Sequence, residues 1–475
     1  MTSAPFAAYC GRLIFDAVLI TRSPLHVGSG FSDGHLTQSS GESKAEGEIA
    51  NVVLGLDDLP VIPATSIKGA MRALIEQSDQ DAAKALFGDI KSDGGGRMGV
   101  LTPYAATTRQ KADVGKRIDR KSEDRGVFIA QRVAIDDASG TAADKKLLTR
   151  TMVAPGHSFN LQMVVMGGDA VLEPPHRDIL VKLLASIRER HLQLGSGKGD
   201  GHGVLAFKLE RVRSLSLNRT TGALDEQDVT SVWTKAIEGT GKPELINGFS
   251  YRYRLQLAGE DVFAVLGARE EPKAKTEQQP ALEKGRGNTL KALRNNDGTP
   301  ELPGTSLMGV LRARAEWLVE LKRARFTPGE EDAILLAELF GAEADALKNI
   351  KPRLAKRNGI KPGNLTGFAG MLRVISIKAK GGNIVTTPSV RIDRLAQAPM
   401  DGGLFAFEAF DQPTFEVELG LDHRAKDCHA EFVEALLKDI IAEGPRQGLM
   451  LGHRGNSGFG WVAVTRNETV PGGAS

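Results

Sequence analysis

Two glycine-rich stretches of the chain share one pattern: LGSGKGDGHGVLAF at Leu194–Phe207 and LGHRGNSGFGWVAV at Leu451–Val464. They align without gaps over their whole length, and an apolar run that predicts a β-strand closes each copy. A flexible linker has no physical reason to recur in register, so the pair indicates an internal duplication. The positions identical in both copies are Leu194/Leu451, Gly195/Gly452, Gly201/Gly458, Gly203/Gly460 and Ala206/Ala463.

A second matched pair, Leu59–Gln77 and Thr299–Trp317, lies upstream of the two glycine-rich stretches. Each has two prolines three residues apart, then a Thr-Ser pair and the spacing of an amphipathic helix. In the first copy, Thr65 and Ser66 are candidate N-caps for that helix. Three more landmarks recur in the same order: Leu86-Phe87-Gly88 with Leu339-Phe340-Gly341, Gly99-Val100-Leu101 with Gly370-Met371-Leu372, and Ile135-Asp136 with Ile392-Asp393.

The duplication predicts the fold of both halves. Each copy opens with an alternating strand, near Arg12 and near Tyr251, and continues with a helix, further strands, a late helix and a last strand. This order is that of a ferredoxin-like unit with insertions. We therefore predict an α+β protein with two tandem ferredoxin-like domains, residues 1–210 and 249–475, and a linker at 211–248 that is rich in Thr, Ser, Gly and charge.

The composition is that of a soluble globular protein. Of the 475 residues, 41% are hydrophobic and 25% are charged, and no apolar run approaches the length of a membrane span. Cys10 and Cys428 lie far apart and outside any Cys-x-x-Cys group, which argues against a disulfide framework and a structural zinc site. We expect a cytoplasmic protein without membrane contact. The net charge of +2 indicates no partner, so a nucleic-acid function must rest on local clusters.

The glycine-rich stretches do not match the nucleotide-binding motifs. The first contains no G-x-G-x-x-G and no G-x-x-x-x-G-K-[ST], and it follows a helix where a dinucleotide fingerprint follows a strand. Two interpretations stay open: a backbone that approaches a phosphate closely, or a tight turn needed for packing. For the first of these, the added donors are Lys198, His202, His453 and Arg454.

Local basic clusters favour RNA as the ligand. Between Arg109 and Arg132 there are eight basic residues and four acidic ones, and Lys348–Lys361 holds six basic residues and no acid. Such clusters bind a phosphate backbone without sequence preference. Aromatic residues are only 5% of the chain, which favours backbone contacts over base stacking. The candidate RNA-binding residues here and at the two helix starts are Lys116, Arg117, Arg120, Lys121, Lys356, Arg357, Ser66, Lys68, Arg72, Ser306 and Arg312.

Taken together, the motifs resemble those of the repeat-associated mysterious protein (RAMP) superfamily. LHVGSG at Leu25–Gly30, the Pro-x-x-Pro helix, Leu-Phe-Gly and the glycine loop carry the resemblance, which covers nearly the whole chain, once per half. PGTSL at Pro303–Leu307 is similar to the backbone subunits of type III CRISPR–Cas effector complexes of the Csm and Cmr kind. The resemblance implies a modified RNA-recognition-motif fold and partners that comprise a guide RNA (crRNA), a complementary target RNA and other CRISPR effector subunits. It also implies a β-hairpin thumb between guide and target.

The resemblance further implies that an acid in the loop after the first strand cleaves target RNA with a divalent metal. Counting back from Pro60 without gaps places Glu48 at that position, and Asp33 is the other acid in the right loop. A carboxylate there would hold Mg²⁺ near the scissile phosphate. The same count in the second half gives Asn288, which cannot serve as an anionic ligand. We therefore expect the first half to be the one that cleaves, with Glu48 and Asp33 as metal ligands.

Two other functions stay open. The chain fits an RNA-binding scaffold subunit without chemistry of its own. It also fits, less well, a metal-independent endonuclease that processes repeat RNA, in which His26 or His35 would act as general acid or base. Such an enzyme should carry one glycine loop and no doubled Pro-x-x-Pro helix, and this chain has two of each.

Overall fold

The structure is a computed structural model of the chain. It describes residues 11–34, 48–76, 79–90, 96–108, 126–135, 142–167, 174–188, 192–218, 220–240, 249–265, 289–295, 298–322, 330–343, 346–444, 448–453, 455 and 458–467. The chain forms two compact units. The first module comprises Met1–Lys198 and His202–Gly248, and the second comprises Phe249–Ser475 with Gly199–Gly201.

The core of the first module is an antiparallel sheet backed by helices. Its central strands are β13 (Val204–Leu217), β1 (Gly11–Thr21) and β11 (Ser158–Met166), and β7 (Leu101–Pro103) and β8 (Ala106–Thr108) pair with the far edge of β11. Helix α1 (Ala64–Glu76) follows the first core strand and α3 (Pro174–Arg188) precedes the last. Strand order fourth–first–third–second with this helix placement is the ferredoxin-like topology.

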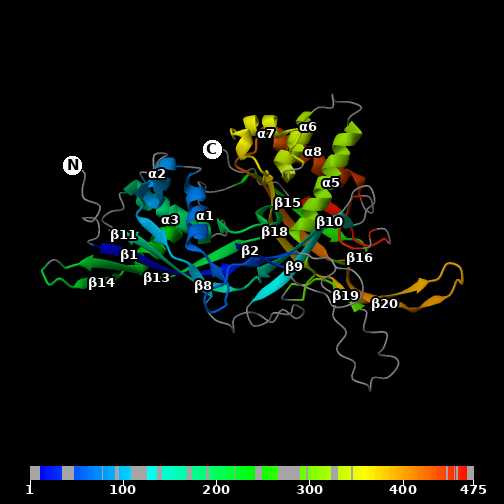
Figure 1. Cartoon of the computed structure of the whole chain (residues 1–475), viewed down its shortest axis with the longest axis horizontal. Coiled ribbons are helices and arrows are strands. Elements are labelled where there is room, and N and C mark those ends of the chain that lie inside the picture. Colours follow the sequence, from blue (N-terminus) through cyan, green and yellow to red (C-terminus); the bar gives the residue numbers. More distant parts are fainter. Residues whose placement is uncertain are drawn as a thin grey trace, which may run out of the picture. The chain divides into compact units, whose positions relative to one another are not determined.

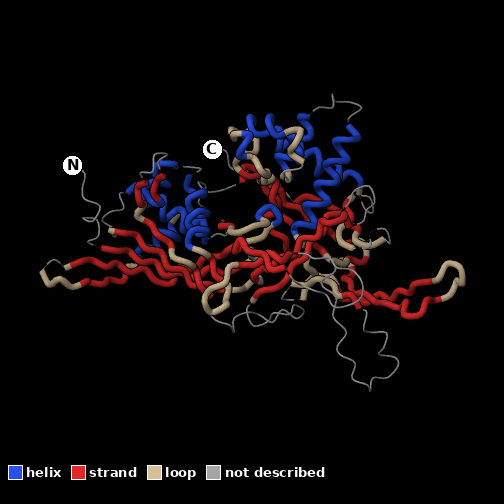
Figure 2. Tube along the Cα trace, viewed as in Figure 1, coloured by secondary structure: helices blue, strands red, loops and turns tan. Residues whose placement is uncertain are grey.

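The second module repeats this topology. Its sheet runs β18 (Leu372–Lys380), β21 (Thr414–Asp422), β15 (Phe249–Gly259) and β23 (Trp461–Asn467), and β22 (Leu449–Met450) lies at the edge. Helices α5 (Gly304–Lys322) and α8 (Asp427–Glu443) take the places of α1 and α3. Figure 2 shows the helices of each module gathered on one side of its sheet. The prediction of two tandem ferredoxin-like domains is confirmed.

Both modules carry a long β-hairpin at the same point of the topology, between the second and third core strands. In the first module it is formed by β9 (Val127–Ile135) and β10 (Ala142–Val153), and in the second by β19 (Asn383–Ile392) and β20 (Pro399–Asp411). Figure 1 shows β19 and β20 extending away from the helices of their module. Short strands join these hairpins into separate sheets: β2 (Gly28–Gly34) and β3 (Glu48–Val52), and β16 (Val262–Phe263) and β17 (Thr289–Leu290).

The remaining elements differ between the modules. The first has β4 (Val61–Ile62), α2 (Gln80–Phe87), the hairpin of β5 (Gly88–Ile90) and β6 (Gly96–Met98), and β12 (Leu192–Gln193). A 3₁₀ turn at Lys198–Asp200 follows β12, and its last two residues belong to the second unit. The second has α6 (Glu330–Phe340), α7 (Lys351–Arg357) and a 3₁₀ turn at Pro362–Asn364.

The stretch whose composition predicts a linker has regular structure where the chain is described. After its core pairing, β13 runs on to Leu217 and pairs with β14 (Leu224–Asp228), and α4 (Thr230–Gly239) follows. All five residues of β14 are exposed, which explains its polar composition. Trp233 and Ile237, four residues apart, are 0% and 3% exposed and belong to the core of the first module. The composition that predicted a linker thus comes from the exposed strand β14 and the short amphipathic helix α4.

Helices α1 and α5 bury the apolar stripes that the sequence predicts. In α1, Ile67, Met71 and Ile75 are fully buried, and in α5 so is Leu307. Helix α1 begins at Ala64, one residue earlier than Thr65, so Thr65 and Ser66 lie in its first turn and are not the N-caps that we expected. The amides of Ser66 and Ser306 donate to the carbonyls of the preceding prolines, Pro63 and Pro303.

Candidate functional site

Three of the backbone hydrogen bonds of the first glycine loop fix its two ends. Leu194 N donates to Gly203 O at 3.0 Å and closes the loop on itself. Gly203 N donates to Pro24 O at 2.8 Å, and Ser196 N donates to His26 O at 3.0 Å. The loop is therefore fixed to the chain that leaves β1.

The glycines at the two ends of this loop are required by contact. A Cβ on Gly195 would lie 2.0 Å from His26 O, and one on Gly203 would lie 1.9 Å from Leu194 O. Both residues also have positive φ, +77° and +74°. At Gly199 a Cβ would meet no atom within 4 Å. Of the two interpretations of the loop, close packing accounts for Gly195 and Gly203.

The second glycine loop repeats these contacts. Leu451 N donates to Gly460 O at 2.8 Å, Gly460 N to Val262 O at 2.9 Å, and His453 N to Ala264 O at 2.7 Å. A Cβ on Gly460 would lie 2.0 Å from Leu451 O. Because loop, first strand and hydrogen bonds all match, Ala264 is the counterpart of His26.

In the first module the glycine loop meets the base of the inserted hairpin through polar side chains. We call this place the first junction: His26, Arg150, Thr151 and Ser196. His26 Nδ1 lies 2.7 Å from Thr151 O and so carries the proton that it donates, and Arg150 Nη1 donates to Ser196 Oγ at 2.7 Å. Burial lowers the pKa of His26, and the nearby charge of Arg150 lowers it further, although the hydrogen bond to Thr151 opposes both. His26, only 7% exposed, is therefore a neutral imidazole near pH 7.

The two predicted metal ligands lie on strands that adjoin this junction. Glu48 begins β3, and β3 runs parallel to β10 with Ala50 opposite Arg150. The register of β2 and β3 pairs Asp33 with Ile49 and Gly34 with Glu48, so the backbones of the two acids are close but not directly opposite. The side chains of Asp33 and Glu48 lie outside the described part of the structure.

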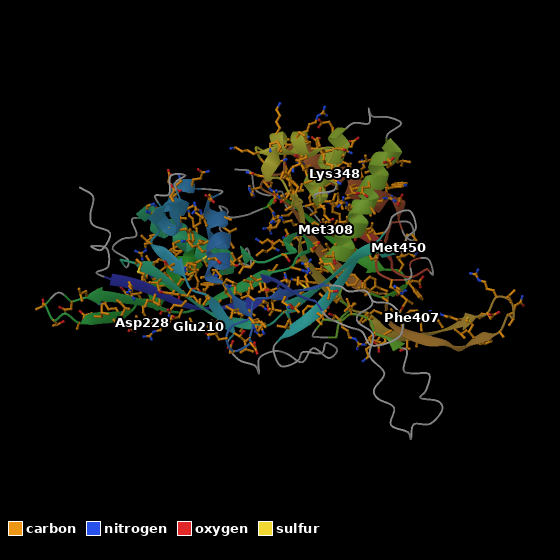
Figure 3. The ribbon with its side chains drawn as sticks, viewed as in Figure 1. Glu210, Asp228, Met308, Lys348, Phe407 and Met450 are labelled. Carbon is orange, nitrogen blue, oxygen red and sulfur yellow. The ribbon has the colours of Figure 1, made fainter. Side chains whose placement is uncertain are left out.

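The second junction has the same backbone and different chemistry. There Phe407 of β20 stands opposite Leu290 of β17, as Arg150 stands opposite Ala50. This register makes Leu290 the counterpart of Ala50. Phe407 is 1% exposed, and its ring meets that of Phe459 in the glycine loop edge-on, at 5.4 Å between centroids. Phe407 is labelled at the base of the hairpin in Figure 3.

The two predicted RNA-binding arginines of α1 and α5 make matching contacts within the fold. Arg72 Nη1 donates to Gly88 O at 2.9 Å, and Arg312 Nη1 donates to Gly341 O at 3.5 Å. Each also pairs with a glutamate one turn later, Glu76 or Glu316. Gly88 and Gly341 end the duplicated Leu-Phe-Gly motif, so these contacts tie two landmarks together in each module.

The other predicted site residues lie on several elements of the two modules. Ser66, Lys68 and Ser306 are half-buried in the first turns of α1 and α5, Lys198 begins the 3₁₀ turn, and His202 is buried at 9% exposure. Lys356 is exposed on α7 and His453 is exposed in the second glycine loop. The predicted site residues that fall outside the described residues are Lys116, Arg117, Arg120, Lys121, Arg454 and His35, and the landmark residue Asp136 falls there too.

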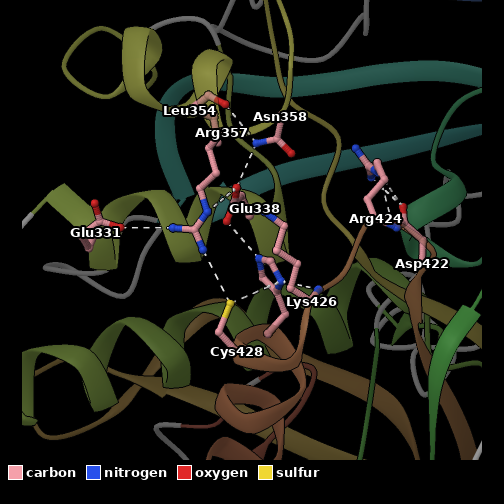
Figure 4. A network of polar contacts seen from close by, with 10 residues as sticks. Glu331, Glu338, Leu354, Arg357, Asn358, Asp422, Arg424, Lys426 and Cys428 are labelled. Carbon is pink, nitrogen blue, oxygen red and sulfur yellow. Dashed lines mark hydrogen bonds and ion pairs between the residues drawn. The ribbon is translucent and has the colours of Figure 1, made fainter.

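Sequence reasoning missed a buried polar cluster in the second module, drawn in Figure 4. Glu338 is 1% exposed, and its carboxylate accepts hydrogen bonds from His429 Nε2 at 2.9 Å and Asn358 Nδ2 at 2.9 Å. Arg357 Nε lies 3.3 Å from the same carboxylate. His429 Nδ1 accepts from Lys426 N at 2.9 Å, so the proton of its ring is on Nε2. The cluster anchors α7 to α6 and α8, and Arg357 is one of its structural members.

Burial would raise the pKa of Glu338, but the hydrogen bonds from His429 and Asn358 and the charge of Arg357 outweigh it and lower the pKa. The carboxylate is therefore ionised and paired. The counterpart of Glu338 is Ala85, which precedes Leu86-Phe87-Gly88, so the first module has no such carboxylate. No local motif marks the cluster, because its members come from three helices.

The duplicated Ile-Asp landmark ends the outer strand of the hairpin. Asp393 follows β19 at the tip, where its Oδ1 accepts from Leu395 N at 2.8 Å and Ala396 N at 2.7 Å. This capping of a turn at the tip of the hairpin gives Asp393 a structural role.

A comparison with protein-family models matches one family to both modules, at residues 18–206 and 229–463. That family is the RAMP superfamily. The chain belongs to it. Its members are CRISPR-associated RNA-binding proteins, which is the coarse function that membership gives this chain. No curated protein gives a significant match.

Among the described residues, none of the helices is long and apolar enough to pass through a membrane. Nor do three or more His, Cys, Asp or Glu side chains gather there in a way that could hold a metal ion.

Proposed function

We propose that this RAMP protein is a guide-RNA-binding backbone subunit of a type III CRISPR effector complex, with two backbone modules fused in one chain. The observation that carries the proposal is the tandem repetition of one frame with one hairpin inserted at the same point of each. Subunits that stack along an RNA strand must present the same surface at regular intervals, and a fused pair supplies two such surfaces.

Exposed cations support an RNA-binding role. Lys356 on α7 and Lys361 after it are both exposed, and the Glu338 cluster fixes the helix from which Lys356 extends. Cations on a fixed helix bind a phosphate backbone electrostatically, without sequence preference.

RNA that co-purifies with the chain tests this function. We expect RNA of a defined length, set by the guide, to come with the tagged protein. The double variant Lys356→Glu/Lys361→Glu should weaken RNA binding and reduce the slope of log K against log salt by about 2, about 1 for each lost phosphate contact. Lys235→Glu, which reverses an exposed cation on α4, is the matched control and should leave both unchanged. Protein free of RNA would contradict the proposal.

We also propose that any cleavage of target RNA resides in the first module, where Asp33 and Glu48 would hold Mg²⁺. Support comes from the position of β3 beside the polar first junction and from the count along the sequence, which gives Asn288 where the first half has Glu48. Asp33→Asn and Glu48→Gln, made singly, should each abolish cleavage by the reconstituted complex and leave RNA binding intact. Unchanged cleavage in both would leave the scaffold function. Cleavage of free repeat RNA in EDTA, lost in His26→Asn, would instead favour the processing endonuclease.

A further inference from the structure

The last core helices, α3 and α8, are equivalent residue by residue. The strand registers match, because Leu19 pairs with Phe159 and Phe207 where Leu257 pairs with Phe415 and Val464. Counting back from Leu194 and Leu451 without gaps then aligns the helices. The pairs that matter are Arg177/Glu434, Asp178/Ala435, Val181/Lys438 and Ala185/Ala442, and on the first core strands Phe15/Tyr253.

In the first module a helix of the same chain covers the outer face of α3. Helix α4 places Trp233 against Phe15, edge-on with 4.8 Å between ring centroids. Arg177 lies over the Trp233 ring at 5.3 Å. Under this cover Val181 is 8% exposed and Ala185 is 0% exposed.

In the second module the equivalent face is open. No helix follows β23 among the residues that the structure describes, and Lys438 and Ala442 are exposed. A groove of about 400 Å³ lies here, lined by Glu434, Ala435, Lys438, Ile441, Ala442 and Arg466. It occupies the place that the duplication predicts for a covering helix.

A buried polar group beside this groove lacks a partner. Tyr253, the counterpart of Phe15, is 1% exposed, and within the described structure its hydroxyl makes no hydrogen bond. Arg466 lies over its ring at 5.9 Å and donates to both carboxylate oxygens of Glu434, with 2.7 Å from Nη2 to Oε1. A buried hydroxyl without a partner is costly, and such groups are rare in complete structures. A polar group brought into the groove would satisfy this hydroxyl.

We propose that the groove between α8 and β23 docks an amphipathic helix of a different protein, in the position that α4 holds in the first module. Helix α4 and its contacts predict which side chains the docked helix should carry. It should insert one large apolar residue, as α4 inserts Trp233, and offer a polar group to the hydroxyl of Tyr253. An acidic residue at its rim would pair with Lys438, and the small side chains of Ala435 and Ala442 let the two helices approach closely.

We assign the occupant to a different protein because α4, the helix that would fill the groove from a second copy of this chain, already packs against its own module. Trp233 and Ile237 of α4 are buried in the core of their own module, and Val229 N donates to Val212 O at 3.0 Å to hold the start of the helix. Releasing α4 to serve a second copy would expose those side chains.

Site-specific photo-cross-linking tests the proposal on the assembly purified from native cells through a tag on this chain. We place p-benzoylphenylalanine at Ala442, and as a control at Val232, which is 51% exposed on the outer face of α4. Position 442 should cross-link at least tenfold more than position 232, and the cross-linked peptide should map to an amphipathic helix of another polypeptide. In Ala435→Glu/Ala442→Glu, that polypeptide should fall at least tenfold in recovery while RNA still co-purifies.

Three results would overturn the inference: a cross-link from position 442 to a second copy of this chain, no cross-link there above the control, or an unchanged assembly in the double variant. Neither substituted alanine is fully buried, so circular dichroism of the double variant should match the unaltered protein. RNA content is read separately, so failure here is distinct from failure of the RNA-binding function.

Discussion

The two junctions between glycine loop and inserted hairpin share a backbone and differ in side chains. His26 and Ala264 accept equivalent amide hydrogen bonds, yet Arg150 meets Ser196 in the first junction where Phe407 meets Phe459 in the second. Residues identical in both modules, such as Gly203 and Gly460, make contacts that any copy of the frame needs. Residues that differ between the modules do not make contacts that both copies of the frame require. Differences between the copies therefore indicate roles that are specific to one module.

The largest effects should come from the shared glycines. Gly203→Ala and Gly460→Ala force a Cβ into a backbone carbonyl, so each should destabilise its own module by about 4 kcal/mol or more, at the upper end of single-residue effects. Denaturant unfolding followed by fluorescence checks this, with Trp233 reporting the first module and Trp317 and Trp461 the second.

Gly199→Ala is the control in the same loop, because a Cβ there meets open space and Gly199 is not among the glycines with positive φ. It should change stability by less than about 1 kcal/mol. Equal losses of stability in Gly199→Ala and Gly203→Ala would show that the loop tolerates a side chain at neither position. That result would contradict the explanation by contact between the new Cβ and a backbone carbonyl.

The junctions themselves can be compared by truncation. Phe407→Ala removes a buried ring and should cost the second module about 3 to 4 kcal/mol. Arg150→Ala removes the exposed hydrogen bond to Ser196 and should cost the first module about 1 kcal/mol. A large loss of stability in Arg150→Ala would mean that the polar junction is structural, and would weaken its link to the chemistry expected of Asp33 and Glu48.

The sequence predicted the shared frame well, because duplication reveals which residues a fold cannot do without. The strand order, the stripe of Ile67, Met71 and Ile75, and the closed glycine loops all follow from patterns that occur twice. The same evidence was ambiguous about role: Arg72 and Arg312 have the charge of phosphate ligands, and only their hydrogen bonds to Gly88 and Gly341 reveal a part in packing.

The unshared features were harder to predict. Glu338, His429 and Asn358 are distant in sequence and meet only in the folded second module. Trp233 could not be recognised as a core residue, because the exposed strand β14 beside it gives the whole segment the composition of a linker. Such features depend on tertiary contacts that no local spacing records.

The Glu338 cluster makes the modules differ in their response to acid. Because the folded pKa of Glu338 is lowered, its carboxylate stabilises the second module above the ordinary glutamate pKa of 4.5, and this contribution is lost as pH falls through the lowered folded value. Glu338→Gln puts an amide among the donors Asn358 and Arg357 and should cost about 3 kcal/mol near pH 7.

The measurement is denaturant unfolding of the second module between pH 7 and pH 3. The difference between Glu338→Gln and the unaltered protein should shrink as the pH falls below 4.5, the ordinary glutamate pKa, since protonation of Glu338 removes the same charge. A difference that stays constant with pH would contradict an ionised Glu338, and an equal loss in the first module would contradict the asymmetry.

The smallest effects should come from Arg72 and Arg312, which perform the same task with unequal contacts. Arg72→Met should cost the first module about 1 kcal/mol, because it removes a 2.9 Å hydrogen bond to Gly88 O. Arg312→Met should cost the second about 0.5 kcal/mol, because its bond to Gly341 O is 3.5 Å long and its side chain is more exposed. RNA affinity, measured at one salt concentration on the folded variants, separates this role from phosphate binding. If affinity falls tenfold while stability holds, the two arginines are RNA ligands, as their charge first suggested, and the matching contacts to the Leu-Phe-Gly motif are secondary.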